Sequence, residues 1–345
     1  MMNRMLSILS TVLAALLPLP VVADLAGGAT AVSQYGKERD EQTLSADLSW
    51  TPGQWTVYVE GSTGLSSDSL LAAYPGVNAD AATAVNSDGN GRVQVSELKY
   101  RFQPGSAALV VGLLDATAYL DTSRVANDET RQFLGADFVN NPSIAFPDYA
   151  PGIALLQPVG DAEWRAVLGS SKGLAGTSGT RYSETLEITG RERGMFLATE
   201  WRNIAGDTDW SIGAWHNSGD VERPDGQGET NERAGIYGGL DTPVAGGDAN
   251  LRAGWNNSHG KPVRAFLAAA WTIDWQEWRL GIAHARRFAN SATTGNDADH
   301  SEIFLQRALA SGLHLAIDLQ YLSGNSNGPP RPDGAIAGLR LHYGF

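Results

Sequence analysis

The sequence predicts an all-β protein that forms a single closed antiparallel barrel of about 16 membrane-spanning strands. First, side chains alternate to the end of the chain: Leu339, Leu341, Tyr343 and Phe345 share one face, and Arg340 and His342 the other. Second, long polar connections alternate with short ones. Third, after residue 23 no apolar run approaches the ~18 residues that a membrane-spanning helix needs. In a membrane, such a chain satisfies its backbone hydrogen bonds only as a closed barrel.

The first 23 residues have the pattern of a secretory signal peptide. Arg4 is the only charged residue in this segment, the run 5–17 is apolar, and small residues lead to Ala23. The apolar run is too short to span a membrane and is followed by two prolines, Pro18 and Pro20. The alternative is a buried N-terminal helix. We expect cleavage after Ala23, which leaves residues 24–345 as one barrel domain.

The composition restricts the classes of function. The chain has 345 residues, with 25 Lys and Arg residues against 38 Asp and Glu residues and a formal net charge of −13. Such an acidic chain is poorly suited to bind nucleic acid. There is no cysteine, which excludes disulfides and thiol chemistry. The 40 glycines and 10 tryptophans suit many turns and an aromatic belt at the membrane interface.

The connections between strands are sorted by length. The long ones are 62–91, 116–148, 218–231, 256–261, 289–300 and 323–334. The short ones are 51–54, 104–105, 204–207, 241–247, 274–275 and 311–312. Outer-membrane barrels place long loops outside the cell and short turns in the periplasm. A soluble β-sandwich has no reason to sort its loops in this way.

The strands themselves alternate apolar and polar side chains. In 313–321, for example, the apolar row faces one way, and His314, Asp318 and Gln320 face the other. In a barrel, the polar row lines the lumen. We also assign strands to 28–35, 150–159 and 181–188. An even number is required if both chain ends lie in the periplasm, which gives about 16.

The tract 116–148 is too long for a plain connection. Asn127 is a candidate N-cap of a short helix, Phe133 and Phe138 give that helix an apolar side, and the sequence at 140–142 would end it. Apolar residues in an exposed loop need a surface on which to pack. We therefore expect this tract to fold into the barrel and narrow it; the alternative is a loop packed over the rim.

Several short motifs resemble the carbohydrate-selective porin family of the OprB type. These are G-L-L-D at 112–115, L-D at 120–121, A-N at 126–127, Q-F-L at 132–134, F-V-N-N-P at 138–142 and the ending A-G-L-R-L-H-Y-G-F. The resemblance covers most of the chain after the signal peptide but matches poorly between 170 and 230. It implies a 16-stranded porin of the bacterial outer membrane that passes sugars by diffusion through a constriction built from inward-folded loops.

Charged residues on the lumen side are candidates for contact with a solute. A sugar needs hydrogen-bonding groups that hold it weakly enough for release, and the rigid arginine fork suits this role. The strand candidates are Arg101, Arg165 and Arg279, and the loop candidates are Asp115, Asp121, Arg124, Glu129 and Arg131. The alternative for each is ordinary lumen lining, hydrated or paired across strands.

The segment 86–97 has the ligand spacing of a calcium loop. Asn86, Asp88, Asn90, Arg92 and Glu97 stand at positions 1, 3, 5, 7 and 12, where Arg92 would offer its backbone carbonyl. Against calcium, Asn replaces Asp at the first position and no helix precedes the loop. The alternative is an Asx/Gly turn that leads into a strand. The sequence requires no other cofactor.

A passive porin for small polar solutes, most of all sugars, is the function that this sequence favours. Its partners would be outer-membrane lipid and the solute, and a homo-oligomer is compatible with it. The six histidines have no metal-ligand spacing and there is no G-x-S-x-G motif, so we expect no enzyme. The alternatives are an outer-membrane barrel enzyme acting on lipid or peptide, and a secreted soluble β-sandwich or adhesin.

Overall fold

The computed structural model of the chain describes most residues after the predicted signal peptide. The described ranges are 24–65, 68–81, 83–86, 88–174, 181–189, 193–203, 206–223, 226–257, 260–329 and 331–345. The predicted signal peptide, residues 1–23, lies outside them. Within these ranges, no helix has both the length and the apolar character needed to cross a membrane.

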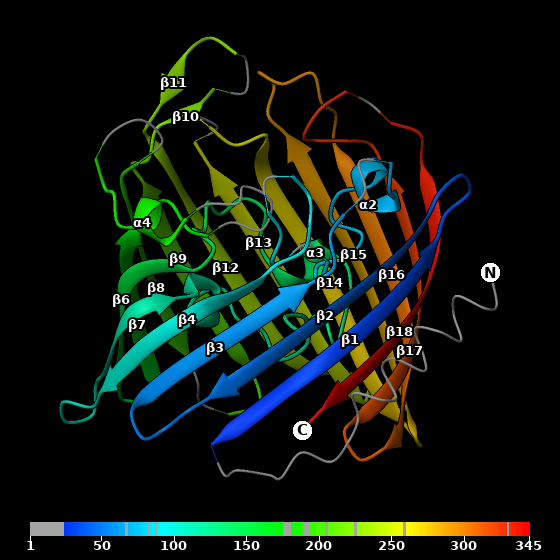
Figure 1. Ribbon diagram of the computed structural model, residues 1–345, viewed down its shortest axis with the longest axis horizontal. Coiled ribbons are helices and arrows are strands. Elements are labelled where there is room, and N and C mark those ends of the chain that lie inside the picture. The colour runs from blue at the N-terminus through cyan, green and yellow to red at the C-terminus, as the bar shows by residue number, and fades with distance from the viewer. Residues whose placement is uncertain are drawn as a thin grey trace.

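Sixteen antiparallel strands close into one barrel (Figure 1). They are β1 (Leu25–Tyr35), β2 (Asp40–Trp50), β3 (Trp55–Ser62), β4 (Val93–Phe102), β5 (Ala108–Leu114), β6 (Ala150–Val159), β7 (Ala162–Ser170), β8 (Met195–Asn203), β9 (Asp209–Asn217), β12 (Arg233–Val244), β13 (Gly247–Asn256), β14 (Val263–Trp275), β15 (Trp278–Ala289), β16 (Ala298–Ala310), β17 (Leu313–Ser323) and β18 (Gly334–Gly344). The predicted barrel and strand number are confirmed, and a two-sheet sandwich is excluded.

The last strand closes the barrel, as its alternating pattern predicts. β18 pairs with β1 from Gly28↔Gly344 to Tyr35↔Ala337, and with β17 on its other side. Arg340, on the polar face, is only 1% exposed and lies inside the barrel. Because both edges of the terminal strand are paired, the chain end has the backbone partners that a frayed terminus lacks.

Two of the three additional strand predictions are confirmed, and one is wrong. Strands occupy 28–35 and 150–159, within β1 and β6. The segment 181–188 instead holds the short helix α4 (Tyr182–Thr185), in the connection between β7 and β8. These two strands pair directly, from Ala162↔Asn203 to Ser170↔Met195. The barrel wall therefore has no place for a strand between them, and the alternation of 181–188 does not reflect pairing.

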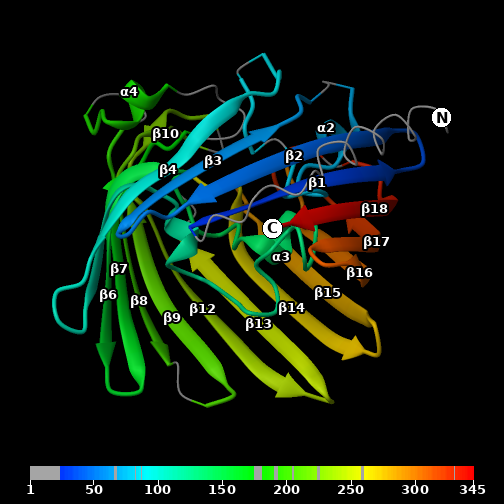
Figure 2. The ribbon, with the colours of Figure 1, turned by 60° about the horizontal axis from the view of Figure 1, so that its bottom comes forward.

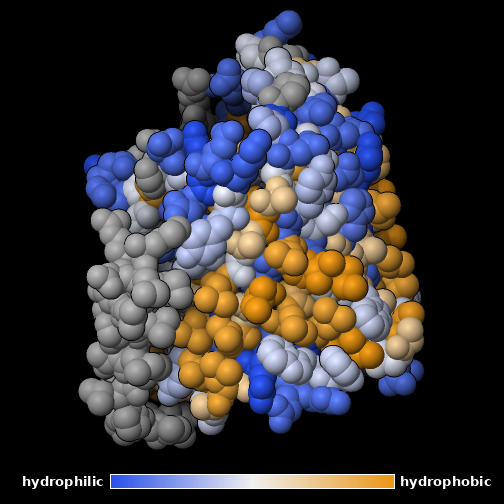
Figure 3. Space-filling view, turned by 90° about the vertical axis from the view of Figure 1, so that its right-hand side faces the viewer, coloured by the Kyte–Doolittle hydropathy of each residue, from blue (hydrophilic) through white to orange (hydrophobic). Residues whose placement is uncertain are grey.

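The outer surface has the pattern of a membrane-spanning barrel. Figure 3 shows an apolar band below a polar rim on the face it presents. Outward aliphatic side chains such as Ile212 and Leu267 are 59% and 54% exposed. Seven of the ten tryptophans lie at the strand ends beside the short turns: Trp50, Trp55, Trp164, Trp201, Trp210, Trp275 and Trp278. This is the expected aromatic girdle at one membrane interface.

The two ends of the barrel carry connections of different length. Short turns such as 160–161 and 276–277 join strands at one end. The opposite end carries the long connections, with α2 (Leu70–Ala73), α4 and the small hairpin β10 (Val221–Glu222) and β11 (Glu229–Thr230). The turn 36–39, between β1 and β2, is the short connection at this end. The predicted sorting therefore holds for the other connections.

The connection between β5 and β6, residues 115–149, folds into the barrel as predicted (Figure 2). We call it the inward loop; it contains the 3-10 turn η1 (Ala116–Ala118) and the helix α3 (Ala136–Val139). Its apolar residues pack in two clusters against inward side chains of the wall. One cluster lies against β5 to β9 and β12, and the other against β14 to β16.

The predicted start of the loop helix is wrong, although its end is confirmed. α3 begins after Gly135 rather than Asn127, and it ends at Asn140. The backbone N–H groups of Leu134 and Gly135 donate to the Glu302 carboxylate on β16, at 2.7 and 2.8 Å. These amides are therefore held by the barrel wall and not by a helix that starts upstream.

Candidate functional site

Charged side chains of the barrel wall hold the inward loop in place, and Arg252 on β13 makes the most contacts. Its Nη2 donates to the carbonyl oxygens of Asp121 and Ala126, at 3.2 and 2.9 Å, and Nη1 donates to that of Val139, at 3.2 Å. Its Nε lies 3.4 Å from the Asp121 carboxylate. Both side chains are almost fully buried, so one arginine joins the two halves of the loop.

Residues 129–137 of the inward loop are held by side chains of β15, β16 and β18. Arg340 donates to the carbonyl oxygens of Glu129 and Gln132, the latter at 2.7 Å. Asp137 accepts from Arg287 at 2.7 Å, and its Oδ2 lies 3.1 Å from His300 Nδ1. The pKa of Asp137 is lowered to about 2, because Arg287 and His300 stabilise its charge more than burial destabilises it.

Residues 119–122 of the inward loop are held by side chains of β7 and β8. Arg165 donates to the Tyr119 carbonyl at 3.1 Å, and Arg202 donates to the Thr122 carbonyl at 3.3 Å. The Asp121 N–H donates to Glu200 at 2.8 Å. Loop carbonyls thus meet arginines, and loop amides meet carboxylates. These backbone groups of the loop thus have hydrogen-bond partners, as backbone that is shielded from water requires.

The inward loop packs against β5 to β16, and two cavities remain on the β1–β3 side. The larger cavity has a volume of about 390 Å³ and lies between the inward loop and Ala79, Ala81 and Thr83 of the β3–β4 connection. The narrow cavity, of about 70 Å³, lies against the inward faces of β1, β2 and β3. The two adjoin, since Thr83, Glu129 and Tyr149 line both.

Carboxylates from strands and loops line these two cavities. They are Asp47, Glu60, Asp80, Asp115, Glu129 and Asp148. None of the described residues that line either cavity is Lys or Arg. Glu60 accepts from neutral donors, Gln94 at 2.8 Å and the Tyr149 hydroxyl at 2.9 Å. Asp80 accepts from the Ser45 hydroxyl at 2.7 Å.

Burial and mutual repulsion weaken the acidity of the loop carboxyls. Burial, followed by the charge of Asp80, raises the pKa of Glu129 to about 8. Burial also raises the pKa of Asp80 and of Asp148 to about 6. Both effects disfavour the charged form of a carboxyl group. The charge of the lining of these two cavities therefore varies across the neutral pH range.

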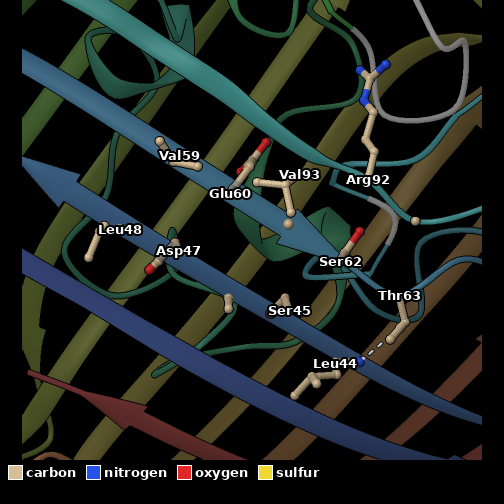
Figure 4. Close-up of a pocket in the computed structure, with 13 residues that line it drawn as sticks. Leu44, Ser45, Asp47, Leu48, Val59, Glu60, Ser62, Thr63, Arg92 and Val93 are labelled. Atoms are coloured by element: carbon tan, nitrogen blue, oxygen red, sulfur yellow. Dashed lines mark hydrogen bonds between the residues drawn. The ribbon is translucent and has the colours of Figure 1, made fainter. Parts of the chain in front are cut away.

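A further cavity, of about 540 Å³, lies on the outside of the same wall between β2 and β3 (Figure 4). Its apolar side chains include Leu44, Leu48 and Val59, which belong to the outward rows of these strands. Asp47 and Glu60 alternate with them and project to the lumen. This groove faces lipid and is separate from the lumenal cavities.

The structure divides the eight predicted solute-contact residues into groups. Asp115 and Glu129 line the larger cavity. Arg165 and Asp121 are buried anchors, and Arg124 bonds to Asp248 at 3.2 Å and the Asp207 carbonyl at 2.7 Å. Arg101 and Arg279 lie at the ends of β4 and β15 beside short turns. Arg131 is exposed, and a Cβ on Gly344 would lie 2.8 Å from its Nη2.

Other lumenal residues escaped the sequence analysis. Asp47 and Glu60 occupy inward positions of β2 and β3, where period-two alternation around Leu48 and Val59 was a usable signal. Asp80 lies in the loop between β3 and β4, and no local pattern marks it. The anchors Arg252 and Glu302 were detectable as inward charges, but their loop partners are more than 100 positions away in sequence.

Of the predicted calcium ligands, Asn86, Asp88 and Asn90 share one turn, whereas Glu97 lies in β4. Asp88 Oδ2 accepts from the Asn90 side chain at 2.8 Å in an exposed turn. Glu97 lies within β4, where it pairs with Lys99 at 2.6 Å and accepts from the Asp115 N–H at 3.0 Å. Since 93–97 is extended strand, position 12 cannot fold back over the turn. In the described part of the chain, no group of three or more His, Cys, Asp or Glu residues forms a metal-binding arrangement.

Comparisons with known proteins support the fold. OprB of Pseudomonas putida superposes with a TM-score of 0.66 over 93% of both chains, at 9% identity. A porin of Rh. blastica, in a mutant form, gives 0.55 over 93% of this chain and 99% of that one, at 10% identity. OmpT, an outer membrane protein of Vibrio cholerae, gives 0.53 over 95% and 99%, at 11% identity.

At the level of sequence the similarities are limited. No protein-family model matches the chain. An uncharacterized protein of Aquifex aeolicus is 49% identical over 49 residues, which is 14% of this chain and 16% of that protein. The resemblance to OprB-type porins is therefore confirmed in the fold: the chain is a 16-stranded membrane barrel built like outer-membrane porins.

Proposed function

We propose that this protein is a passive porin of the bacterial outer membrane, through which small polar solutes, carbohydrates among them, diffuse. The observation that carries the proposal is the one-sided filling of the barrel. The inward loop covers the wall from β5 to β16 and leaves polar cavities on the side of β1 to β3. A barrel that served only as a membrane anchor would have no need of a fixed loop that leaves such a space.

The lining of this space suits hydrated, hydrogen-bonding solutes. The larger cavity presents Asn127, Asn140, Thr117 and Tyr149 together with its carboxylates. These side chains offer donors and acceptors to sugar hydroxyls without a deep, closed pocket that would retain them. Of the arginines that the sequence suggested as sugar contacts, Arg165 and Arg124 bond between the loop and the barrel wall, and Arg101 and Arg279 lie beside short turns. Carbohydrate passage would therefore depend on the amide, hydroxyl and carboxylate groups.

Liposome swelling with purified protein tests this function. A series of mono-, di- and trisaccharides should enter at rates that fall steeply with size, because the passage is narrow. Planar bilayers containing the protein should show stepwise conductance increases. The absence of conductance at every voltage, together with no swelling in any sugar, would contradict the proposal. Gel migration that differs between heated and unheated samples is the control for a folded barrel.

A further inference from the structure

We propose that the passage beside β1 to β3 selects small cationic solutes over anionic ones. This inference rests on the proposed function and adds the charge class of the solute. The carboxylates Asp47, Glu60, Asp80 and Glu129 surround the narrow cavity, and Asp115, Glu129 and Asp148 the larger one. They act on a passing solute through the field of the passage, so no ion needs to be held at a fixed point.

The acidic residues reach the passage from independent parts of the fold. Asp47 and Glu60 come from β2 and β3, Asp80 from the β3–β4 connection, and Asp115 and Glu129 from the inward loop. A solute that passes between the loop and the wall therefore meets carboxylates on both sides. Opposed charges of one sign in a narrow polar space exclude ions of the same sign more strongly than a single charged wall does.

Two basic residues of the lumen weaken this field only in part, because they have partners of their own. The charge of Arg340 lowers the pKa of Asp80, but its guanidinium donates to two loop carbonyls and lies 3.4 Å from Asp318. Lys99 is paired with Glu97 at 2.6 Å. Arg131 is different: it is exposed, and its guanidinium lies beside Gly344, which pairs with Gly28 of the narrow-cavity lining. Its single positive charge opposes the field of the four carboxyl groups that line this cavity.

Another basic side chain acts on the lining of the larger cavity. The charge of Lys261, in the β13–β14 connection, lowers the pKa of Asp148, although burial and Asp115 together outweigh it. Burial, together with the charge of Arg233, lowers the pKa of Lys261 to about 8. Because Lys261 partly compensates Asp148, the decisive variants are those on the narrow cavity.

The test is the reversal potential of the purified full-length protein in planar bilayers under a KCl gradient. Wild-type channels should favour K⁺ over Cl⁻ by about tenfold at 0.1 M salt, the low end of enrichment by a charged cleft. The preference should fall at 1 M salt, where the screening length shortens from about 10 to about 3 Å. At pH 9, where Glu129 is charged, the variants Asp47→Asn and Glu129→Gln, alone and combined, should each reduce the ratio at 0.1 M salt.

Glu277→Gln is the matched control, because it removes one acidic charge from a short turn at the barrel end. It should leave the K⁺ to Cl⁻ ratio unchanged. Channels that conduct but show no cation preference, or a preference that Asp47→Asn and Glu129→Gln leave intact, would overturn the selectivity while leaving the porin function standing. A protein that forms no channels would instead overturn the proposed function itself. Both Asn and Gln preserve side-chain shape, and heat-modifiable migration verifies that each variant folds.

Discussion

Replacing Arg252 with Met should loosen the inward loop without unfolding the barrel. Arg252 donates three hydrogen bonds to loop carbonyls and pairs with Asp121, and it is only 2% exposed. Removing one partner of a buried ion pair costs about 3–5 kcal/mol. Burial already raises the pKa of Asp121 to about 7, so this carboxyl can take up a proton when the arginine is lost. We therefore expect a cost near the lower limit, about 3 kcal/mol.

Hydrogen exchange measures this loss directly. About 3 kcal/mol corresponds to about a hundredfold change in the equilibrium between docked and undocked loop. Amides of the segment 121–126 should exchange about a hundredfold faster in Arg252→Met, while strand amides keep their protection. Loosening should also raise single-channel conductance and its noise.

Arg279→Met is the control for the loop-docking experiment. Arg279 also faces inward, but its described contacts are Thr272 at 3.5 Å and Asp274 at 3.9 Å, both near a short turn. This variant should leave loop exchange unchanged. Equal exchange of 121–126 in wild type and Arg252→Met would refute the view that wall arginines hold the constriction. A similar increase in Arg279→Met would show that inward charge in general, and not the anchor, matters.

Three more predictions follow from the lining and the anchors. The K⁺ to Cl⁻ permeability ratio should rise between pH 6 and 9, because Glu129, with its pKa raised to about 8, is neutral below that pH and charged above it; a Glu129→Gln channel that still shows the full rise would disprove this assignment. Gly135→Ala should speed amide hydrogen exchange at 133–138 by one to two orders of magnitude, because its Cβ would lie 2.4 Å from His300 Cε1 and overpacking costs about 1–3 kcal/mol. Gly239→Ala is the control, because the nearest atom to its Cβ lies at 3.4 Å, and it should leave this exchange unchanged. Arg131→Ala should increase the cation preference measured by reversal potential, because it removes an exposed lumenal positive charge. Arg124→Ala should change this preference little, because the Arg124 guanidinium is paired with Asp248. A larger effect of Arg124→Ala than of Arg131→Ala would contradict the placement of these residues.

The sequence predicted the barrel well because its signals are local. Period-two alternation marks β17 and β18, and the lengths of the connections separate the two ends of the barrel. The segment 181–188 failed for the same reason: it alternates locally but has no strand to pair with, since β7 and β8 pair with each other. Pairing is a property of distant residues, and alternation alone does not report it.

The candidate site was less predictable, because solute-contact residues were chosen for their charge and their side of the strand, whereas their roles depend on which residues they bond to. Alternation correctly places Arg165 on the lumen side, yet its guanidinium bonds to the Tyr119 carbonyl of the inward loop. Asp115 and Glu129 were identified from the loop sequence and do line the larger cavity. Whether a charged side chain of the wall stays solvated depends on where the inward loop lies. The contacts between loop and wall join residues that are far apart in the sequence, so local patterns do not report them.

The separation of charges in the lumen follows from how a buried loop must be satisfied. A backbone that folds into a barrel brings carbonyl groups that need donors and amides that need acceptors. On the covered wall, arginines such as Arg252 meet the carbonyls, and carboxylates such as Glu302 meet the amides. On the uncovered wall, no described backbone group of the loop is bonded to Asp47 or Glu60. The charges of these two carboxylates therefore act on the passage. Moving the loop away from Arg252 should therefore do more than widen the channel. It would release positive charge into the lumen and weaken the cation preference, so conductance and selectivity should change together in a variant that undocks the loop and keeps its arginine anchors.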